Sequence, residues 1–495
     1  MLESLWAGFV NVMHLTPLLA CFAGVLMGTL VGILPGIGPS GTMALMLPFT
    51  FSLDPTSALI MLAGIYYGAQ YGGSTTSILL NLPGEASSVM TAIEGYQMAK
   101  KGRGGAALTI AAVGSFIAGT VSIFGLIFLG PPLAKAALSF GPPEIFSIMV
   151  LGFVILSTIS GGSTLKSGLM ILVGLMVGTV GFDNISGVVR FTFGSTTAMD
   201  GIEFIPVVMG IFGIAEILWS LVGNEEEIKP ASIRLRDLYP NREEISRSVA
   251  PVFRGSILGF LIGLIPGPSA VISTMVSYAA EKRLSKHGNF GQGAIEGIAG
   301  PESANNATST GALIPLLVLG IPFAPPTAIL LSGLMLQGII PGPLLFTQHA
   351  DIFWGLVASM YIGNVLLLIF NLPLVGVFAS LLRIRPAYLN TLIISLCLIG
   401  AFSLSNRMFE MWIVVVFGII GFLMQYFGYK GAPLVLGIVL GPMLETNFRR
   451  SLIMLANPAA FLERPITVTI LLIATLIIIL PFVLERIRKT GEKRA

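Results

Sequence analysis

Two clusters of small polar side chains are the strongest candidates for chemistry in this sequence. The first reads Tyr-Gly-Gly-Ser-Thr-Thr-Ser over residues 71–77, and the second reads Glu-Ser-Ala-Asn-Asn-Ala-Thr-Ser-Thr-Gly over residues 302–311. Hydroxyl, amide and carbonyl oxygens are hard ligands that suit a cation such as Na⁺, and hydroxyls with N–H groups can hold a carboxylate. Such a density of polar groups is costly in an apolar interior unless the groups line a polar site. The clusters therefore predict a site for an ion and a carboxylate.

The candidate ligands fall into two sets. We expect Na⁺ to be bound by oxygens of Ser74, Thr75, Thr76, Asn81, Thr308, Ser309 and Thr310. We expect the substrate to contact Ser74, Thr75, Asn305 and Asn306, together with Gly36, Gly38, Pro39, Ser40, Gly267, Pro268 and Ser269 at two helix breaks. Glu302 lies inside the second cluster and is a candidate for a direct role. Hydrogen bonding between packed helices is the alternative for each of these polar residues.

Two Pro-Gly motifs interrupt the apolar runs, Leu-Pro-Gly-Ile-Gly-Pro-Ser-Gly at residues 34–41 and Ile-Pro-Gly-Pro-Ser at residues 265–269. Proline removes a backbone donor and glycine permits non-helical backbone angles, so neither motif can continue a helix. Ser40 and Ser269 are expected to cap the helices that follow, whose free N–H groups would then face an anion. We expect further breaks at the two polar clusters. A turn outside the membrane is the alternative for the Pro-Gly motifs.

The sequence lacks the patterns of common catalytic and metal centres. His14, His287 and His349 show no metal-ligand spacing, and no His-Glu-x-x-His, Gly-x-Ser-x-Gly or Gly-x-x-x-x-Gly-Lys-Ser/Thr motif occurs. Two cysteines permit neither a disulfide framework nor a cysteine metal site. A formal net charge of +3 is too small to imply a nucleic-acid partner. We therefore expect no enzymatic activity, and no cofactor other than a coupling ion.

The elements that position these residues must lie in a membrane. Only 10% of the 495 residues are charged, against roughly 25% in ordinary soluble domains, and the mean hydropathy is +0.90. Continuous apolar runs of about 20 residues can cross a bilayer as helices, whereas a β-barrel needs alternating segments of about ten residues. The sequence therefore predicts an all-α polytopic membrane protein with about 11–14 spanning or half-spanning helices.

The chain contains two related halves. Residues 22–36 align without gaps on residues 253–267, and the identities include a glycine at every fourth position. The identical pairs are Phe22 and Phe253, Gly24 and Gly255, Gly28 and Gly259, Gly32 and Gly263, Pro35 and Pro266, and Gly36 and Gly267. The hydroxyl clusters at 74–76 and 308–310 follow at similar distances. We expect pseudo-symmetric repeats with paired broken helices, inverted if each half has an odd number of spans.

A polar stretch divides the chain. Residues 224–249 hold 11 charged side chains of mixed sign, which suits a solvated connector. We predict a first transmembrane repeat over residues 1–223, a connector over 224–250, a second repeat over 251–450, and an extra C-terminal helix with a basic tail over 451–495.

Three sequence blocks resemble the TctA-type family, the large membrane subunits of tripartite tricarboxylate transporters. They read GILPGIGPSGTMALMLPFTF, then YYGAQYGGSTTSILLNLPGE with EGYQMAKKGRGGAAL, and then GIAGPESANNATSTGALIPLLVLGIP with PGPLLF. The resemblance extends over nearly the whole chain. It implies a secondary transporter of the bacterial inner membrane that works with a small membrane subunit and a periplasmic substrate-binding protein.

The resemblance further implies uptake of carboxylates such as citrate, other tricarboxylates and dicarboxylates, driven by an ion gradient, Na⁺, rather than by ATP. A site between the two halves would face each side of the membrane alternately. The resemblance leaves a homodimer open. A passive carboxylate channel and an intramembrane enzyme are the alternatives, and transport of substrate against its gradient would separate a transporter from a channel.

The C-terminal tail, residues 485–495, is predicted to lie in the cytoplasm by the positive-inside rule. Its basic side chains are Arg486, Arg488, Lys489, Lys493 and Arg494. Arg449 and Arg450 precede the last apolar run and favour the opposite orientation, so fusions after Ala495 decide the question. A fluorescent protein that folds only in the cytoplasm should be active there. Activity of a phosphatase that folds only in the periplasm would contradict the prediction.

Overall fold

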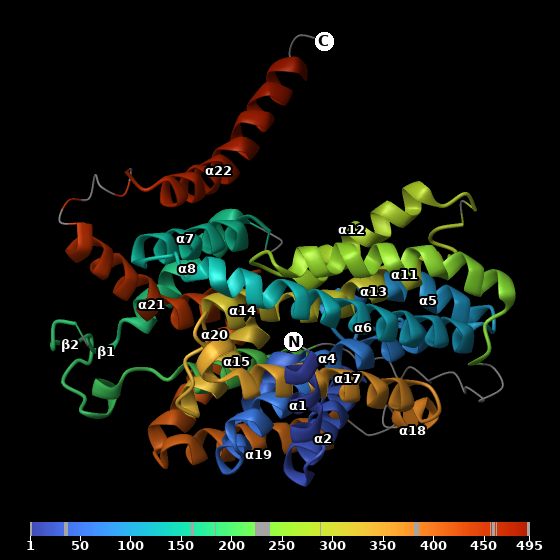
Figure 1. Cartoon of the computed structure of the whole chain (residues 1–495), viewed down its shortest axis with the longest axis horizontal. Helices are drawn as coiled ribbons and strands as arrows, with labels where there is room; N and C mark the ends of the chain where they lie inside the picture. The colour runs from blue at the N-terminus through green and yellow to red at the C-terminus, as the bar shows by residue number, and fades with distance from the viewer. Residues whose placement is uncertain are drawn as a thin grey trace.

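The computed structural model describes residues 2–33, 38–159, 163–183, 185–222, 238–287, 289–380, 386–455, 457, 461 and 463–492. Nearly all of the elements in these ranges are helices (Figure 1). The first half contains α1 (Leu2–Val12), α2 (Leu15–Ile33), α3 (Gly38–Met46), η1 (Leu47–Ser52), α4 (Pro55–Leu80), η2 (Ala86–Ser88), α5 (Val89–Lys100), α6 (Gly104–Ala137), α7 (Pro142–Ile159), α8 (Thr164–Gly178), β1 (Gly181–Phe182), β2 (Val189–Arg190), η3 (Thr197–Asp200), α9 (Phe204–Met209), η4 (Gly210–Ile214) and α10 (Ala215–Val222).

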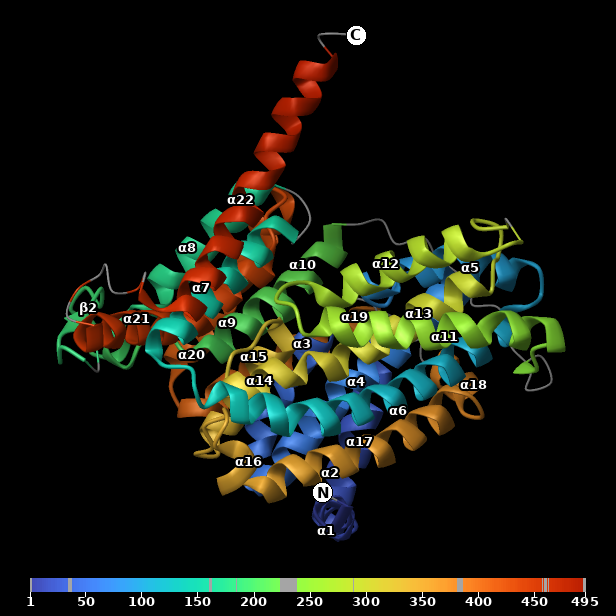
Figure 2. The same ribbon diagram turned by 45° about the horizontal axis from the view of Figure 1, so that its top comes forward.

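The second half is also helical. It contains α11 (Arg242–Gly263), α12 (Ser269–Leu284), α13 (Glu296–Gly311), α14 (Leu313–Leu319), α15 (Pro325–Leu336), α16 (Leu345–Gln348), α17 (Ala350–Asn371), α18 (Val375–Ser380), α19 (Pro386–Ser405), α20 (Met408–Tyr426), α21 (Gly431–Leu455) and α22 (Pro465–Glu492). Helix α22 extends away from the body of the protein (Figure 2).

Seven helices in the described part of the chain are long and apolar enough to cross a membrane: α2, α6, the segment Phe204–Val222, α11, α17, α20 and α21. Shorter apolar helices lie at Pro142–Thr158, Thr164–Gly178, Pro325–Leu336, Asn390–Ser405 and Pro465–Ile479. The prediction of an all-α polytopic membrane protein is confirmed. The two sets together fall within the predicted range of about 11–14 helices.

Helix α2 packs against α4 along the predicted glycine stripe. A Cβ atom at Gly24, Gly28 or Gly32 would lie between 2.3 and 2.6 Å from a backbone oxygen of α4, which is far inside van der Waals contact. Glycine at all three positions therefore allows the two backbones to touch, as in other small-residue helix contacts in membranes.

Helix α11 packs against α13 in the same way. A Cβ atom at Gly255, Gly259 or Gly263 would lie between 2.2 and 2.6 Å from a backbone oxygen of α13. The other face of α11 exposes large apolar side chains at the same four-residue spacing, namely Phe253, Ile257 and Leu261. Helix α11 thus presents small residues to the protein and large apolar residues outward, where a bilayer would cover them.

The two helix pairs also end alike. Gly32 approaches Gly72 of α4, and Gly263 approaches Gly311 at the end of α13. Nine residues after each of these two partners, a helix ends in a left-handed residue, Asn81 after α4 with φ +59° and Gly320 after α14 with φ +69°. This shared spacing supports the predicted duplication, and the inversion of the halves stays a prediction.

The same register corrects our pairing of the hydroxyl clusters. Counted from Gly72 and Gly311, Ser74 matches Leu313, and Thr308 matches Ala69. The clusters at 74–76 and 308–310 therefore occupy different heights in their helix pairs.

The predicted helix breaks at the polar clusters were wrong. Helix α4 runs unbroken through residues 71–77, and α13 continues to Gly311 before a one-residue interruption at Ala312. The glycines of α4 serve close packing instead, and the hydroxyls of Thr76 and Ser77 donate to the Gly73 carbonyl of their own helix at 3.2 and 2.8 Å. Polar groups satisfied within a helix do not require it to open.

The connector is partly helical. Of residues 224–250, those up to 237 lie outside the described residues, and residues 242–250 form the first turns of α11. Asn241 caps this helix, since its side chain accepts from the Glu244 N–H at 2.8 Å while Glu244 accepts from the Asn241 N–H at 2.7 Å. This reciprocal cap starts the helix inside a sequence whose composition suggested a loop.

The β1–β2 hairpin forms a charged cluster with α21. The strands pair antiparallel, with Gly181 opposite Arg190, and Arg190 donates to Glu445 at 2.7 Å. Hydrogen bonds from Ser186 and the Ile185 N–H, with Arg449 and Arg190 close by, hold the pKa of Asp183 well below its usual range. Asp183 and Arg190 lie in the loop between α8 and α9, outside the candidate spans, whereas Glu445 and Arg449 belong to the C-terminal half of α21.

The glycine contacts predict a large effect of a single methyl group. Gly28→Ala and Gly259→Ala should each lower the free energy of unfolding by about 1–3 kcal/mol, because the new Cβ atom overlaps a partner backbone. Gly168→Ala in α8 is the matched control, since no atom lies within 4 Å of its Cβ position, and it should be neutral or stabilising. Thermal unfolding of the detergent-solubilised variants measures the effect. Equal melting temperatures for all three variants would contradict the packing argument.

Candidate functional site

Two helices with polar sequences lie entirely inside the protein. Every residue of α4 from Thr56 to Leu80 is buried, and so are all 16 residues of α13. Figures 1 and 2 show both helices within the body, among α2, α6, α11 and α17. The polar clusters of the sequence are therefore interior, as predicted for groups that line a site.

Helices α4 and α13 are joined directly by a carboxylate. Glu302 of α13 is 1% exposed, and one of its oxygens accepts a hydrogen bond from the Ser74 hydroxyl of α4. The other oxygen accepts from the Thr91 hydroxyl of α5. Ser74 and Glu302 are 228 residues apart in the sequence, so this contact connects the two predicted repeats.

A first cavity lies beside this contact. It is lined by Tyr71, Ser74, Thr75, Leu108, Ala111, Ala112, Ser115 and Asn371. Of the predicted ligands, Ser74 and Thr75 contribute to it. The cavity leaves about 10 Å³ for the centre of a water molecule, which is enough for one water or a small ion.

A second cavity shares the side chain of Tyr71 with the first. It is lined by Tyr67, Tyr71, Gly119, Ile123, Asn306, Ser309, Thr310, Met360 and Asn364, and it leaves about 20 Å³ for the centre of a water molecule. The Tyr71 hydroxyl donates to the Asn364 side-chain oxygen at 2.5 Å. Asn364 in turn donates to the Phe116 carbonyl at 2.8 Å and to the Thr120 hydroxyl at 3.1 Å. The second cluster thus faces a polar wall built by α4, α6 and α17.

Several residues of the clusters hold helices together. Thr308 bonds to the Gly259 carbonyl of α11 at 3.0 Å and to the Ser273 hydroxyl of α12 at 2.7 Å. Thr76 donates within α4, and neither residue lines the two cavities. Asn81 is exposed at the end of α4. The geometry therefore brings five of the predicted ligands to the cavities, namely Ser74, Thr75, Asn306, Ser309 and Thr310.

The second helix break, residues 265–269, lies outside both cavities. Gly267, with φ +126°, ends the turn between α11 and α12, and its N–H donates to the Phe323 carbonyl at 3.1 Å. Pro268 and Ser269 follow it. The expected serine cap was wrong, because Pro268 occupies the cap position of α12 and no side-chain hydrogen bond forms there.

The first Pro-Gly motif is described only in part. Gly36 lies outside the described residues. Gly38, with φ +62°, begins α3, and Pro39 and Ser40 lie in its first turn, so Ser40 is inside the helix rather than at its cap. None of the three lines either cavity.

Four polar residues of this region were not predicted as ligands. They are Glu85, Thr91, Ser115 and Asn364. Ser115 accepts from the Asn306 amide at 2.7 Å. A hydroxyl or amide inside an apolar span, as at Ser115 and Asn364, could have signalled them, and Glu85 follows a Pro-Gly pair just after the end of α4.

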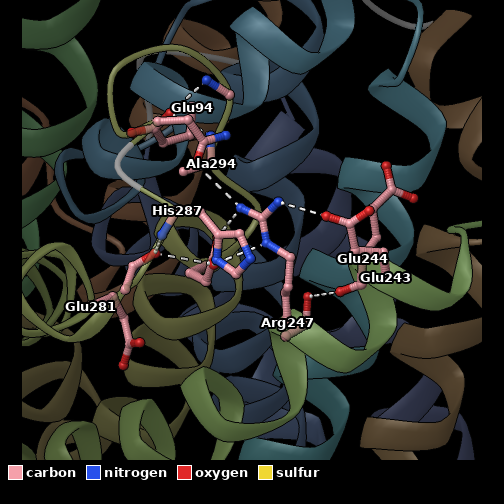
Figure 3. Close-up of polar contacts among 12 residues, drawn as sticks. Glu94, Glu243, Glu244, Arg247, Glu281, His287 and Ala294 are labelled. Atoms are coloured by element: carbon pink, nitrogen blue, oxygen red, sulfur yellow. Dashed lines mark hydrogen bonds and ion pairs between the residues drawn. The ribbon is translucent and has the colours of Figure 1, made fainter.

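A charged cluster fixes the entry to α13. Glu94 of α5 accepts from the backbone N–H groups of Gly291, Gly293 and Ala294 at 2.5–2.8 Å. Arg247 of α11 binds Glu296, the first residue of α13, at 2.8 Å (Figure 3). Thr91 is one helical turn from Glu94, so α5 contacts both the start of α13 and Glu302 in its middle.

The fold and the buried polar contacts define a multi-pass membrane protein with a small central polar site. Residues 18–436 match the tripartite tricarboxylate transporter TctA family. The chain belongs to this family, and the predicted resemblance is confirmed. Membership assigns it to the large membrane subunits of tripartite transporters rather than to enzymes, and it implies partner subunits.

Two relatives come from Agrobacterium vitis. One, described as an uncharacterized 52.8 kDa protein in the TAR-I ttuC' 3' region, is 47% identical over 495 residues, covering all of this chain and 98% of its own length. The other, an uncharacterized protein in the TAR-II ttuC' 3' region, is 44% identical over 228 residues, covering 45% of this chain and 94% of its own. No solved structure matches the chain.

Cavity-lining hydroxyls should matter for transport more than for stability. Thr75→Val and Ser309→Ala should each weaken uptake by about 5- to 150-fold in apparent affinity, the equivalent of a lost hydrogen bond of about 1–3 kcal/mol. Ser122→Ala is the control, because this buried hydroxyl donates only within α6 and lines neither cavity. A hydroxyl used for helix packing should cost about 0.6 kcal/mol of stability and little transport. Unchanged uptake in both site variants would remove these residues from the site.

Proposed function

We propose that this chain is the transport subunit of a binding-protein-dependent secondary transporter that takes up citrate-like di- or tricarboxylates across the bacterial inner membrane. A small membrane subunit and a periplasmic binding protein would complete the system. Family membership supports this proposal, since tripartite transporters are the class to which the chain belongs.

The observation that carries the proposal is the pair of cavities among α4, α6 and α17, the second of which is also lined by α13. Their walls offer hydroxyls and amides from segments that are far apart in sequence, including Ser74, Ser309 and Asn364. Hydroxyl and amide N–H groups can donate to a carboxylate without carrying a charge. A site built from neutral donors binds an anion weakly enough to release it, which a transporter requires.

The size of the cavities supports alternating access. About 10 and 20 Å³ for a water centre is far too little for a dicarboxylate, so substrate entry requires the helices that line the cavities to move apart. Helices that must separate before the substrate fits favour a transporter over a passive channel. The moving boundary would then lie between the α2–α4 pair and the α11–α13 pair.

We further propose Na⁺ as the coupling ion. Oxygen-rich side chains beside the first cavity, those of Ser74, Thr75 and Glu302, are hard ligands for a small cation. A Na⁺ ion bound there would contribute positive charge next to the proposed carboxylate site, which would favour binding of an anionic substrate.

Uptake should follow an imposed Na⁺ gradient. We expect vesicles containing the three subunits to accumulate radiolabelled citrate, or the carboxylate that the binding protein retains, when Na⁺ is high outside. Replacing Na⁺ by choline while keeping the membrane potential should abolish accumulation. Equal accumulation with a proton gradient alone in Na⁺-free buffer would contradict Na⁺ coupling.

A further inference from the structure

Buried carboxylates in this protein have a consistent pattern of partners. Glu296 is held by Arg247 at 2.8 Å, Glu144 by Arg464 at 2.8 Å, and Glu410 by Arg407 at 3.1 Å. Arg254 pairs with Glu281, and Asp183 pairs with Arg449 at 2.7 Å. Each of these acids is therefore neutralised by an arginine, as burial of a charge requires.

Glu94 is the first variation on this pattern. It is fully buried and receives three backbone N–H groups and the Tyr278 hydroxyl, at 2.7 Å from the latter, in place of an arginine. Figure 3 shows Glu94 close to the loop that contains Ala294. Arg247 lies nearby but forms its ion pair with Glu296 instead of Glu94. Four donors to one carboxylate can replace a counter-ion.

Within the ranges that the structure describes, neither Glu302 nor Glu85 is paired with an arginine, and neither is held by four hydrogen-bond donors as Glu94 is. Glu302 receives only two hydroxyls, from Ser74 and Thr91, and no basic side chain acts on it. Glu85 packs beside the same part of α4, since its Cγ atom lies 3.2 Å from the Cβ position of Gly73, the neighbour of Ser74, and its Oε1 atom is buried without a hydrogen-bond partner. Two neighbouring acids without a cation repel each other and lose solvation.

Asn305 provides an independent sign of a ligand at the same place. It is 0% exposed and its side chain interacts with the Glu85 carboxylate, yet its amide oxygen has no hydrogen-bond partner among the described residues. A buried amide group in this state costs about 1–3 kcal/mol. An unpartnered amide oxygen next to two carboxylates is the donor set that a hard cation takes.

The size of the space limits what can bind. The first cavity, which leaves about 10 Å³ for the centre of a water molecule, adjoins the proposed ligands through Ser74, the donor to Glu302; Glu85, Glu302 and Asn305 do not themselves line it. A single dehydrated metal cation fits a space of this size, whereas an organic cation does not; Na⁺ is the hard cation that the proposed coupling calls for. Oxygen-only ligands without histidine or cysteine exclude the soft transition-metal class.

We propose that Glu85, Glu302 and Asn305 form a Na⁺ site, separate from the cavity lined by Asn306, Ser309 and Thr310. This inference rests on the Na⁺ coupling proposed above and deepens it, because it assigns the ion to a pair of carboxylates and an amide rather than to the hydroxyl clusters. Ser74 and Thr91 then act as positioning residues that hold the Glu302 carboxylate by hydrogen bonds.

The test measures Na⁺ binding directly, without a carboxylate substrate. Purified full-length protein is titrated with NaCl at constant ionic strength in choline chloride, and bound radioactive sodium and the melting temperature are both recorded. Wild-type protein should bind Na⁺ saturably and melt at a higher temperature in NaCl. Glu302→Gln and Glu85→Gln should each weaken Na⁺ binding by about tenfold or more, the equivalent of one lost charged contact.

Three variants separate ion binding from general damage. Glu216→Gln is the matched control, since Glu216 is a half-buried acid on α10 that accepts from Gln425 at 2.9 Å and has no part in the proposed site, and it should bind Na⁺ as the wild type does. Glu302→Asp keeps the charge and should retain part of the affinity. If either glutamine variant fails to fold, Asn305→Ala takes its place and should show the same loss.

The outcomes also separate this inference from the proposed function. Wild-type Na⁺ binding with unchanged affinity in Glu85→Gln, Glu302→Gln and Asn305→Ala would overturn the site while leaving Na⁺-coupled uptake intact. Absence of Na⁺ binding by wild-type protein, together with Na⁺-independent uptake in vesicles, would overturn both. Equal losses in the Glu216→Gln control would show a general effect of removing a charge and would overturn the site.

Discussion

The structure depends on contact between helix backbones, made possible by glycine. Helices α4 and α13 carry the two polar clusters, and they are buried from Thr56 to Leu80 and from Glu296 to Gly311. A polar helix can be buried in a membrane protein only if its neighbours exclude lipid and satisfy its side chains. Helices α2 and α11 achieve the first condition by placing glycine stripes directly on the backbones of α4 and α13.

This packing also decides where the polar side chains go. The face of α4 that meets α2 has no room for side chains, because Gly24, Gly28 and Gly32 lie within contact distance of its backbone. The polar side chains of α4 therefore extend toward α13, α5 and α17. There the Tyr71 hydroxyl donates a hydrogen bond to Asn364, and the Ser74 hydroxyl donates one to Glu302. Two cavities that share Tyr71 remain where these groups do not fill the space.

The sequence was sufficient for the membrane class, the glycine stripes and the polarity of the site, because each depends on composition or on a simple period. It misled us about the breaks, since Gly72 and Gly73 resemble helix breakers until their partners are known, Gly32 for Gly72 and Glu85 for Gly73. It also could not show that Ser74 reaches Glu302, because contacts across more than 200 residues depend on tertiary packing. Hydroxyls such as Thr76 could not be separated in advance from those that line a cavity.

The glycine stripes also restrict how this protein can change shape. Glycines recur at every fourth position of α2, so sliding α2 along α4 by less than about 6 Å, four residues of helix rise, would press larger side chains onto a backbone. Intermediate positions of α2 along α4 are therefore excluded by steric clashes between side chains and backbone. Each pair, α2 with α4 and α11 with α13, must therefore move as one rigid body. Any change of backbone conformation must be confined to the non-helical turns that flank the pair.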